Sequence, residues 1–171
     1  KELVEEKERG AKITTEIEML LEFAPCKVIG VTGTEGKTTT SSLINAIIKQ
    51  EGIKCFLGGN IGIPLFTKLR EINPEDIIIL ELSSFQLMGM EVSPNIAVVT
   101  NIFPDHLNVH KDFDDYVSAK GHIAEFQSES DSCIFFKNNE KSREIAEKSK
   151  GKKFSYPIDE KSEKFVHNTQ K

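Results

Sequence analysis

Residues 32–40 read Thr-Gly-Thr-Glu-Gly-Lys-Thr-Thr-Thr, and they constrain the fold more than any other part of the chain. An apolar run precedes them at 28–31, and a stretch with helical periodicity follows at 41–48. A strand, a glycine-bearing turn and a helix in this order are the context in which Gly-Lys-Thr forms a phosphate-binding loop. The alternative, a glycine turn capped by threonines, does not account for both flanking segments.

The chemistry of this loop depends on a few residue types. Gly33 and Gly36 let the backbone curl so that successive N–H groups point at phosphate oxygens, and the start of the following helix adds partial positive charge. Lys37 is predicted to reach the β- and γ-phosphates, and the Thr38 hydroxyl to take a magnesium position. The predicted nucleoside triphosphate ligands are Gly33, Thr34, Glu35, Gly36, Lys37, Thr38 and Thr39.

The loop departs from the strict pattern at two positions. Val31 stands where that pattern has its first glycine, so Gly33 must carry the turn. Glu35 brings a carboxylate close to a polyphosphate, which costs about 1 kcal/mol or more unless the side chain points to solvent.

Composition limits the class of protein. A length of 171 residues suits one domain, and a net charge of −5 without a long basic run argues against nucleic acid or an anionic membrane as a partner. No apolar stretch approaches the roughly 20 residues that span a bilayer. Cys26, Cys55 and Cys133 lack metal-ligand spacing and are expected to be reduced thiols of a cytoplasmic protein. Because the chain begins with Lys1, we expect it to be part of a longer protein.

Strand-like and helix-like segments alternate along the chain. This alternation predicts an α/β domain with a doubly wound, mostly parallel sheet and a site beyond the carboxyl ends of the strands. Strands are predicted at 27–32, 54–57, 77–82, 96–100, 132–137 and 153–155. Helices are predicted at 2–9, 16–23, 37–51, 64–71, 113–126 and 139–150, and the polar segment 157–171 is expected to be a tail or linker.

Polar residues follow several of the predicted strands. Glu81 closes an isoleucine-rich strand, where an acid can hold magnesium, although an acid at a strand end can also be purely structural. His106 follows another strand and could take a second divalent ion, whereas a lone histidine more often has a structural role. Asn60 lies among glycines and could contact a ligand, although an ordinary turn explains the same residues.

Several motifs together resemble those of the Mur ligase family. The phosphate loop is similar to that of the family, whose members also lack the first glycine. The matching segments are 32–40, 58–64, 81–87, 105–107 and 116–120, within a resemblance that covers about residues 10 to 150. The Ser-Ser-Phe-Gln sequence at 83–86 is similar to that of the members that add D-glutamate to UDP-N-acetylmuramoyl-L-alanine. Asn108 departs from the aspartate usual at its position.

The resemblance implies roles for individual residues. Lys37, His106 and Lys120 are the implied catalytic residues, and Lys120 is the lysine that the family carbamoylates. The implied ligands of two magnesium ions are Thr38, Glu81, His106 and Lys120. The implied contacts to the uridine-diphosphate sugar are Asn60, Ser83 and Gln86.

The resemblance also implies an activity. ATP, UDP-N-acetylmuramoyl-L-alanine and D-glutamate would react through an acyl phosphate in peptidoglycan precursor synthesis, in a cytoplasmic and monomeric enzyme. Residues 1–156 would form the central ATP-binding domain, with 1–24 entering from an N-terminal domain, and without the C-terminal domain the piece is expected to be inactive alone. A phosphate-loop NTPase switch and a non-catalytic nucleotide-binding fragment remain as alternatives.

Overall fold

The protein is built on a six-stranded sheet in which every neighbouring pair of strands is parallel. The computed structural model describes residues 5–6 and 8–157. The strands are β1 (Lys27–Thr32), β2 (Cys55–Gly59), β3 (Ile77–Glu81), β4 (Ile96–Val99), β5 (Ser132–Phe136) and β6 (Lys152–Tyr156). Their order is β2-β3-β1-β4-β5-β6, so β2 and β3 lie on one side of β1, and β4, β5 and β6 follow on the other side.

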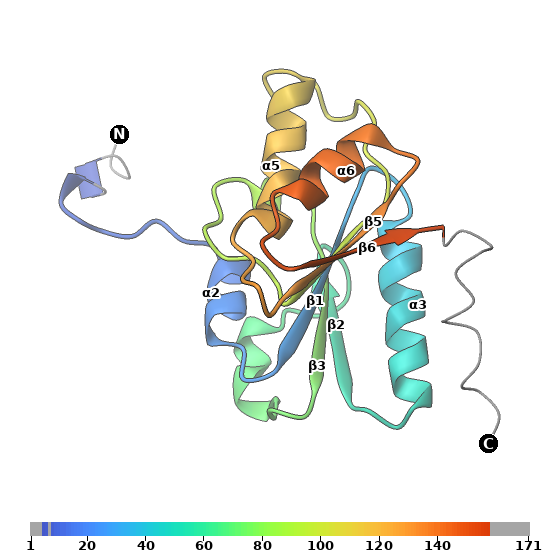
Figure 1. Cartoon of the computed structure of the whole chain (residues 1–171). Coiled ribbons are helices and arrows are strands. Elements are labelled where there is room, and N and C mark those ends of the chain that lie inside the picture. Colours follow the sequence, from blue (N-terminus) through green and yellow to red (C-terminus); the bar gives the residue numbers. More distant parts are fainter. Residues whose placement is uncertain (1–4, 7, 158–171) are drawn as a thin grey trace.

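Helices cover both faces of this sheet, which confirms the predicted doubly wound α/β fold. The helical elements are α2 (Glu16–Phe23), α3 (Lys37–Gln50), the 3₁₀ helix η1 (Phe66–Glu71), α4 (Ser84–Leu87), α5 (Phe113–Glu125) and α6 (Glu140–Glu147). Helix α3 lies on one face, and α2, α5 and α6 lie on the other (Figure 1). No helix within the described residues combines the length and apolar character needed to cross a membrane.

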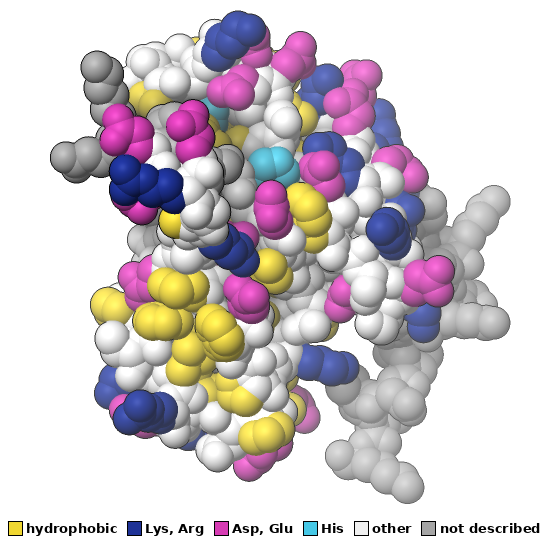
Figure 2. All heavy atoms as spheres, turned by 90° about the vertical axis from the view of Figure 1, so that its left-hand side faces the viewer, with side chains coloured by type: hydrophobic (Ala, Val, Ile, Leu, Met, Phe, Trp, Pro, Cys, Tyr) yellow, Lys and Arg dark blue, Asp and Glu magenta, His cyan; other side chains and the backbone are white. Residues whose placement is uncertain are grey.

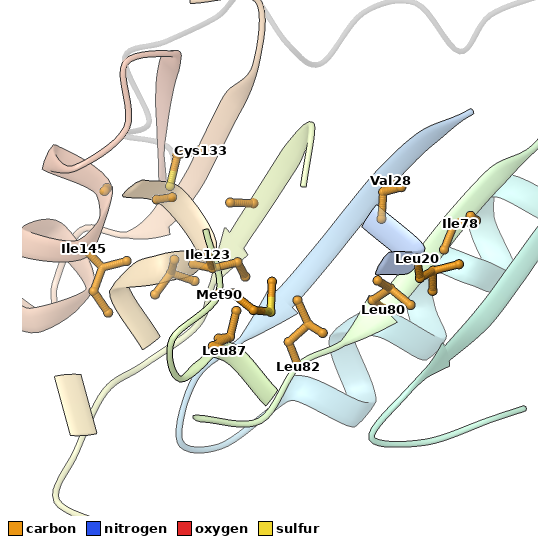
Figure 3. Close-up of a cluster of buried hydrophobic side chains, with 14 of the residues drawn as sticks. Leu20, Val28, Ile78, Leu80, Leu82, Leu87, Met90, Ile123, Cys133 and Ile145 are labelled. Carbon is orange, nitrogen blue, oxygen red and sulfur yellow. The ribbon is translucent and has the colours of Figure 1, made fainter. Parts of the chain in front are cut away.

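The central strands β1, β3 and β4 are largely apolar and buried because each side of the sheet meets a separate core. In β3, Ile78 and Leu80 belong to the larger core, while Ile79 belongs to the smaller core beneath α3. Figure 3 shows the larger core, where Leu20 of α2 and Ile123 of α5 are among the side chains brought together from separate helices. Helices therefore pack on both faces of the sheet, and the carboxyl ends of the strands form a rigid edge on which a site can be built.

The structure differs from the predicted elements at 64–71 and at 84–87. The segment predicted as a helix at 64–71 is a 3₁₀ helix over 66–71, a form common in short pieces. Helix α4 was not predicted, because four residues are too few for a periodic signal. Of the helix predicted at 2–9, residues 5, 6 and 8 are helical and the others are not all described. The predicted tail at 157–171 lies outside the described residues except for Pro157.

Asn139 fastens the segment that follows β4 to the start of α6. It is the N-cap of α6, where its Oδ1 accepts the Ser142 N–H at 2.9 Å. The same side chain accepts the Ile102 N–H at 3.3 Å and donates to the Ile102 carbonyl at 3.1 Å. Because Asn139 is buried, these backbone groups have no access to water as a substitute partner.

We expect Asn139→Ala to lower the free energy of unfolding by about 2 kcal/mol, since it removes a helix cap and leaves buried backbone groups unpaired. Urea unfolding of the chain measures this loss. The adjacent and exposed Asn138 is the matched control, and Asn138→Ala should change stability by less than about 0.5 kcal/mol. Equal effects of the two substitutions would contradict the assignment.

Candidate functional site

The phosphate loop joins β1 to α3 at the carboxyl edge of the sheet. Gly33 and Gly36 have φ angles of 151° and 79°, a region that favours glycine. Gly36 is also the N-cap of α3 and has no side chain with which to cap the helix. The N–H groups of the first turn are therefore directed past the loop, in the arrangement that binds an anion.

The segment after β4 holds this loop in place. The Asn101 carbonyl accepts the Thr34 N–H at 2.6 Å, and the Asn101 side chain accepts the Glu35 N–H at 3.0 Å. The Thr100 hydroxyl donates to the Glu35 carbonyl at 2.7 Å. Sequence reasoning did not single out Thr100 or Asn101, and the available signal was their position directly after a predicted strand. The exposed Glu35 side chain has no described hydrogen bond or ion pair.

Three predicted site residues form one hydrogen-bonded group that joins the start of α3, the end of β2 and the end of β3. The Thr38 hydroxyl donates to Glu81 Oε2 at 2.7 Å, and the Asn60 amide donates to Glu81 Oε1 at 3.1 Å. The Glu81 side chain is thereby held between two neutral donors, and the residue is buried. A hydroxyl beside a carboxylate offers two oxygen ligands of the kind that magnesium prefers.

Ser83 and Gln86, the predicted substrate contacts, form a capping box at the start of α4. Ser83 Oγ accepts the Gln86 N–H at 3.2 Å, and Gln86 Oε1 accepts the Ser83 N–H at 3.0 Å. A serine followed three residues later by glutamine is the sequence signature of this motif. The box explains how so short a helix is held at the site.

Two lysines converge on one carbonyl oxygen. Lys37 Nζ donates to the Gly33 carbonyl at 3.0 Å, and Lys120 Nζ donates to the same oxygen at 2.9 Å. Lys120 has only 2% of its surface exposed, and its Nζ lies 4.7 Å from the centre of the Tyr116 ring. Burial, followed by the charge of Lys37, lowers the pKa of Lys120 to about 7, against an opposing effect from Asp105.

His106 follows the loop-holding segment. Among the described residues it is the one non-glycine with a positive φ, at 53°, and its backbone N–H donates to Asp105 Oδ1 at 2.8 Å. Its exposed ring meets the Phe85 ring edge-on at a centroid distance of 5.6 Å. The side chain is therefore aimed by local backbone geometry rather than by burial.

Most of these residues line two adjoining hollows. The small hollow, of about 200 Å³, is lined by Lys37, Asn60, Ser83, Ser84, Phe85, His106, Tyr116 and Lys120. The large hollow, of about 470 Å³, is lined by α2, residues 59–65, Phe85 and Gln86. Asn60 and Phe85 border both hollows. Figure 2 shows the side of the molecule that carries α2, with hydrophobic side chains gathered on its lower half.

The structure thus brings together Lys37, Asn60, Ser83, His106 and Lys120 around the small hollow. Thr38 and Glu81 form their pair beside it, and Gln86 borders the large hollow instead. No group of three or more His, Cys, Asp or Glu side chains in the described part of the chain is arranged to hold a metal ion. The oxygen pair of Thr38 and Glu81 and the His106–Lys120 side of the hollow remain as separate candidate positions.

Comparison with known proteins gives the family. The sequence model described as the Mur ligase middle domain matches residues 31–171. The chain is 47% identical over 161 residues to a protein from Clostridium kluyveri named UDP-N-acetylmuramoylalanine--D-glutamate ligase, covering 94% of this chain and 35% of that protein. It is 49% identical to the Acetivibrio thermocellus protein of the same name over 150 residues, covering 88% of this chain and 32% of that protein.

A solved structure shows the same fold. MurF from Acinetobacter baumannii is similar with a TM-score of 0.63 and 25% identity, over 78% of this chain and 32% of that one. The chain spans about a third of the length of the curated relatives that it matches. The match over most of the chain, together with the parallel sheet and the phosphate loop, shows that this chain belongs to the Mur ligase family as a middle domain.

Proposed function

We propose that this chain is the ATP-binding middle part of an enzyme that joins D-glutamate to UDP-N-acetylmuramoyl-L-alanine through an acyl phosphate. The observation that carries the proposal is the small hollow, where a phosphate-loop lysine, a buried second lysine and a histidine face one space. The named D-glutamate ligases at 47% and 49% identity support the choice of substrates. We propose residues 1–156 as this domain and expect a monomeric enzyme in the cytoplasm.

Charge determines what the phosphate loop does in this proposal. A substrate carboxylate that attacks a triphosphate brings two anions together, and the transition state gains charge on its phosphoryl oxygens. Lys37 and the N–H groups at the start of α3 would stabilise this charge, because they are held at one edge of the site before the substrates arrive. Asn60, Ser83 and Gln86 would orient the uridine-diphosphate sugar from the side of the large hollow.

The chain offers ligands that fit magnesium at one position. Thr38 and Glu81 present a hydroxyl and a carboxylate 2.7 Å apart, which match the preference of magnesium for oxygen ligands. Bound magnesium ions would neutralise phosphate charge and help to orient the attacked phosphorus. His106 and Lys120 would serve a second ion, but an unmodified ammonium would repel it, so this position requires a change in Lys120.

Carbamoylation of Lys120 would supply that change. A carbamate forms from a neutral amine and carbon dioxide, and it replaces a cation with anionic oxygen. Lys120 is buried, and its hydrogen-bond acceptors are the neutral Gly33 carbonyl and Thr32 hydroxyl. With a pKa of about 7, a large fraction of the amine is neutral at physiological pH, unlike that of an ordinary lysine.

Two other functions would use fewer of these residues. A phosphate-loop switch that only hydrolyses nucleotide needs the loop, Thr38 and Glu81, and it gives no role to Lys120. A nucleotide-binding fragment without catalysis needs the loop alone. Dependence of turnover on both the muramoyl substrate and D-glutamate separates the ligase from both alternatives.

We expect Lys37→Ala to weaken ATP binding by the 171-residue chain by an order of magnitude or more, because a charge-assisted contact contributes roughly 1.5–3 kcal/mol. Titration calorimetry with ATP and magnesium measures the change. Lys49, exposed in the last turn of the same helix, is the matched control, and Lys49→Ala should bind as the parent does. Equal affinities of the Lys37 variant and the parent would exclude this contact.

The lowered pKa of Lys120 should make the free energy of unfolding depend on pH. Between pH 7 and 10.5 the unfolded chain holds more protons at this site than the folded chain, so the contribution of Lys120 to stability rises with pH there. We expect Lys120→Met to be more stable than the parent near pH 6, where the buried charge is fully present. Its advantage should shrink by up to about 1.4 kcal/mol per pH unit above pH 7.

Urea unfolding in buffer freed of carbon dioxide tests this pH dependence at about pH 6 and pH 9. Lys150→Met is the control at an exposed lysine and should show no such trend relative to the parent. A stability difference between Lys120→Met and the parent that stays constant with pH would mean that the Lys120 pKa is ordinary.

In the full-length protein, we expect ADP release to require UDP-N-acetylmuramoyl-L-alanine and D-glutamate together. Lys120→Ala should remove most of this activity, and short-chain carboxylates such as acetate should restore part of it by occupying the position of the carbamate. Lys150→Ala should remain fully active. ATP hydrolysis at the same rate with and without the two substrates would refute the ligase proposal. A fully active Lys120→Ala enzyme would refute only the role of the carbamate and leave the ligase proposal standing.

A further inference from the structure

His110 lies at the end of the loop that carries His106, and its side chain has no exposed surface. Its Nδ1 is 3.0 Å from Asp115 Oδ2, and its Nε2 is 2.9 Å from Ser84 Oγ. The hydrogen bond from His110 is the largest cause that lowers the pKa of Asp115, so this carboxylate is ionised at neutral pH and can only accept. Nδ1 therefore donates to the Asp115 carboxylate, and Nε2 is hydrogen-bonded to the Ser84 hydroxyl.

These two bonds join separate helices. Asp115 lies in the first turn of α5, and Ser84 is the first residue of α4, next to the proposed substrate contact Ser83. A ring whose two nitrogens are both bonded cannot turn without breaking a buried hydrogen bond, which is costly. His110 thus fixes the position of the α4 turn relative to α5.

The same ring supports the side chain of Phe85. The two rings stack with centroids 5.3 Å apart and an angle of 14° between their planes. Phe85 is 44% exposed and borders both hollows, so without a partner it would be free to change rotamer. The His110 backbone N–H also donates to the His106 carbonyl at 3.1 Å. The buried His110 therefore supports both Phe85, which borders the two hollows, and the turn that orients His106.

We propose that His110 is a positioning residue for the muramoyl substrate, acting through Phe85 and Ser84 at the passage between the two hollows. This inference rests on the proposed function. A substrate with its nucleotide-sugar part in the large hollow and its carboxylate in the small one must pass between Asn60 and Phe85, which border both. The orientation of Phe85 then sets the width of that passage. Toward the phosphate loop, His110 meets the Tyr116 ring edge-on at a centroid distance of 5.2 Å, and the Tyr116 hydroxyl lies 3.1 Å from Thr34 Oγ1, an aromatic contact that another ring at position 110 can keep.

Kinetics of the full-length protein test the assignment. His110→Phe keeps an aromatic ring for stacking but loses both side-chain hydrogen bonds, and we expect it to raise KM for UDP-N-acetylmuramoyl-L-alanine about tenfold. KM for ATP should stay within about twofold. Ser84→Ala should produce part of the same effect, and the double variant should be no worse than His110→Phe, because both substitutions remove the same bond.

His122 provides the matched control. Its Nδ1 lies 2.8 Å from the carbonyl of Leu87, so it also holds α4, but at a residue that lines neither of the two hollows. His122→Gln should leave both KM values unchanged. A parallel rise of the two KM values in His110→Phe, or no rise for the muramoyl substrate, would overturn the positioning role.

NMR of the 171-residue chain tests the hydrogen bonds of His110 without relying on enzyme activity. We expect NMR to detect a slowly exchanging imidazole N–H of His110 in the parent chain and to lose it in Ser84→Ala, whose ring is no longer held at Nε2. A full-length parent without ligase turnover would disprove the proposed function while leaving this measurement intact. Absence of the protected N–H from the parent chain would overturn the positioning role in an active enzyme as well.

Discussion

Two lysine ammonium groups meet at the carbonyl oxygen of Gly33, and the rest of the site depends on this arrangement. Lys37 comes from the first turn of α3 and Lys120 from α5, so one acceptor connects helices that cover opposite faces of the sheet. A single neutral carbonyl cannot offset two positive charges in a buried space. Burial, followed by the charge of Lys37, lowers the pKa of Lys120, and the remaining positive charge makes the pocket favourable for anionic groups.

The two lysines can be held close together because the phosphate loop and the strands around it are rigidly fixed. The Gly33 carbonyl belongs to a loop held between β1 and α3, and Thr100 and Asn101 fasten the same loop to the end of β4. The strands beneath are buried on both faces, so an opening of the lysine pair would have to disturb well-packed cores. An arrangement held by protein before any ligand arrives is what electrostatic catalysis of phosphoryl transfer requires.

The two hollows have separate roles in the proposed function, since the small one would hold the reacting phosphate and carboxylate and the large one the nucleotide sugar. The phosphate loop and Lys120 lie on the side of the small hollow, while α2 and residues 59–65 form the large one. The contacts of His110 reach Phe85, Ser84, the Tyr116 ring and the backbone of His106. Binding of one substrate and orientation of the other can therefore be altered separately by substitution.

The sequence alone determined the phosphate loop and the alternation of strands and helices. These features are local, because they depend on glycine placement, residue periodicity and spacings of a few positions. Only the tertiary structure decided that Lys120 is buried against Gly33, 87 positions away, and that His110 pairs with Ser84 and Asp115. Burial and pKa depend on strand order and on which helices meet at the sheet edge, and these follow from the packing of the whole chain.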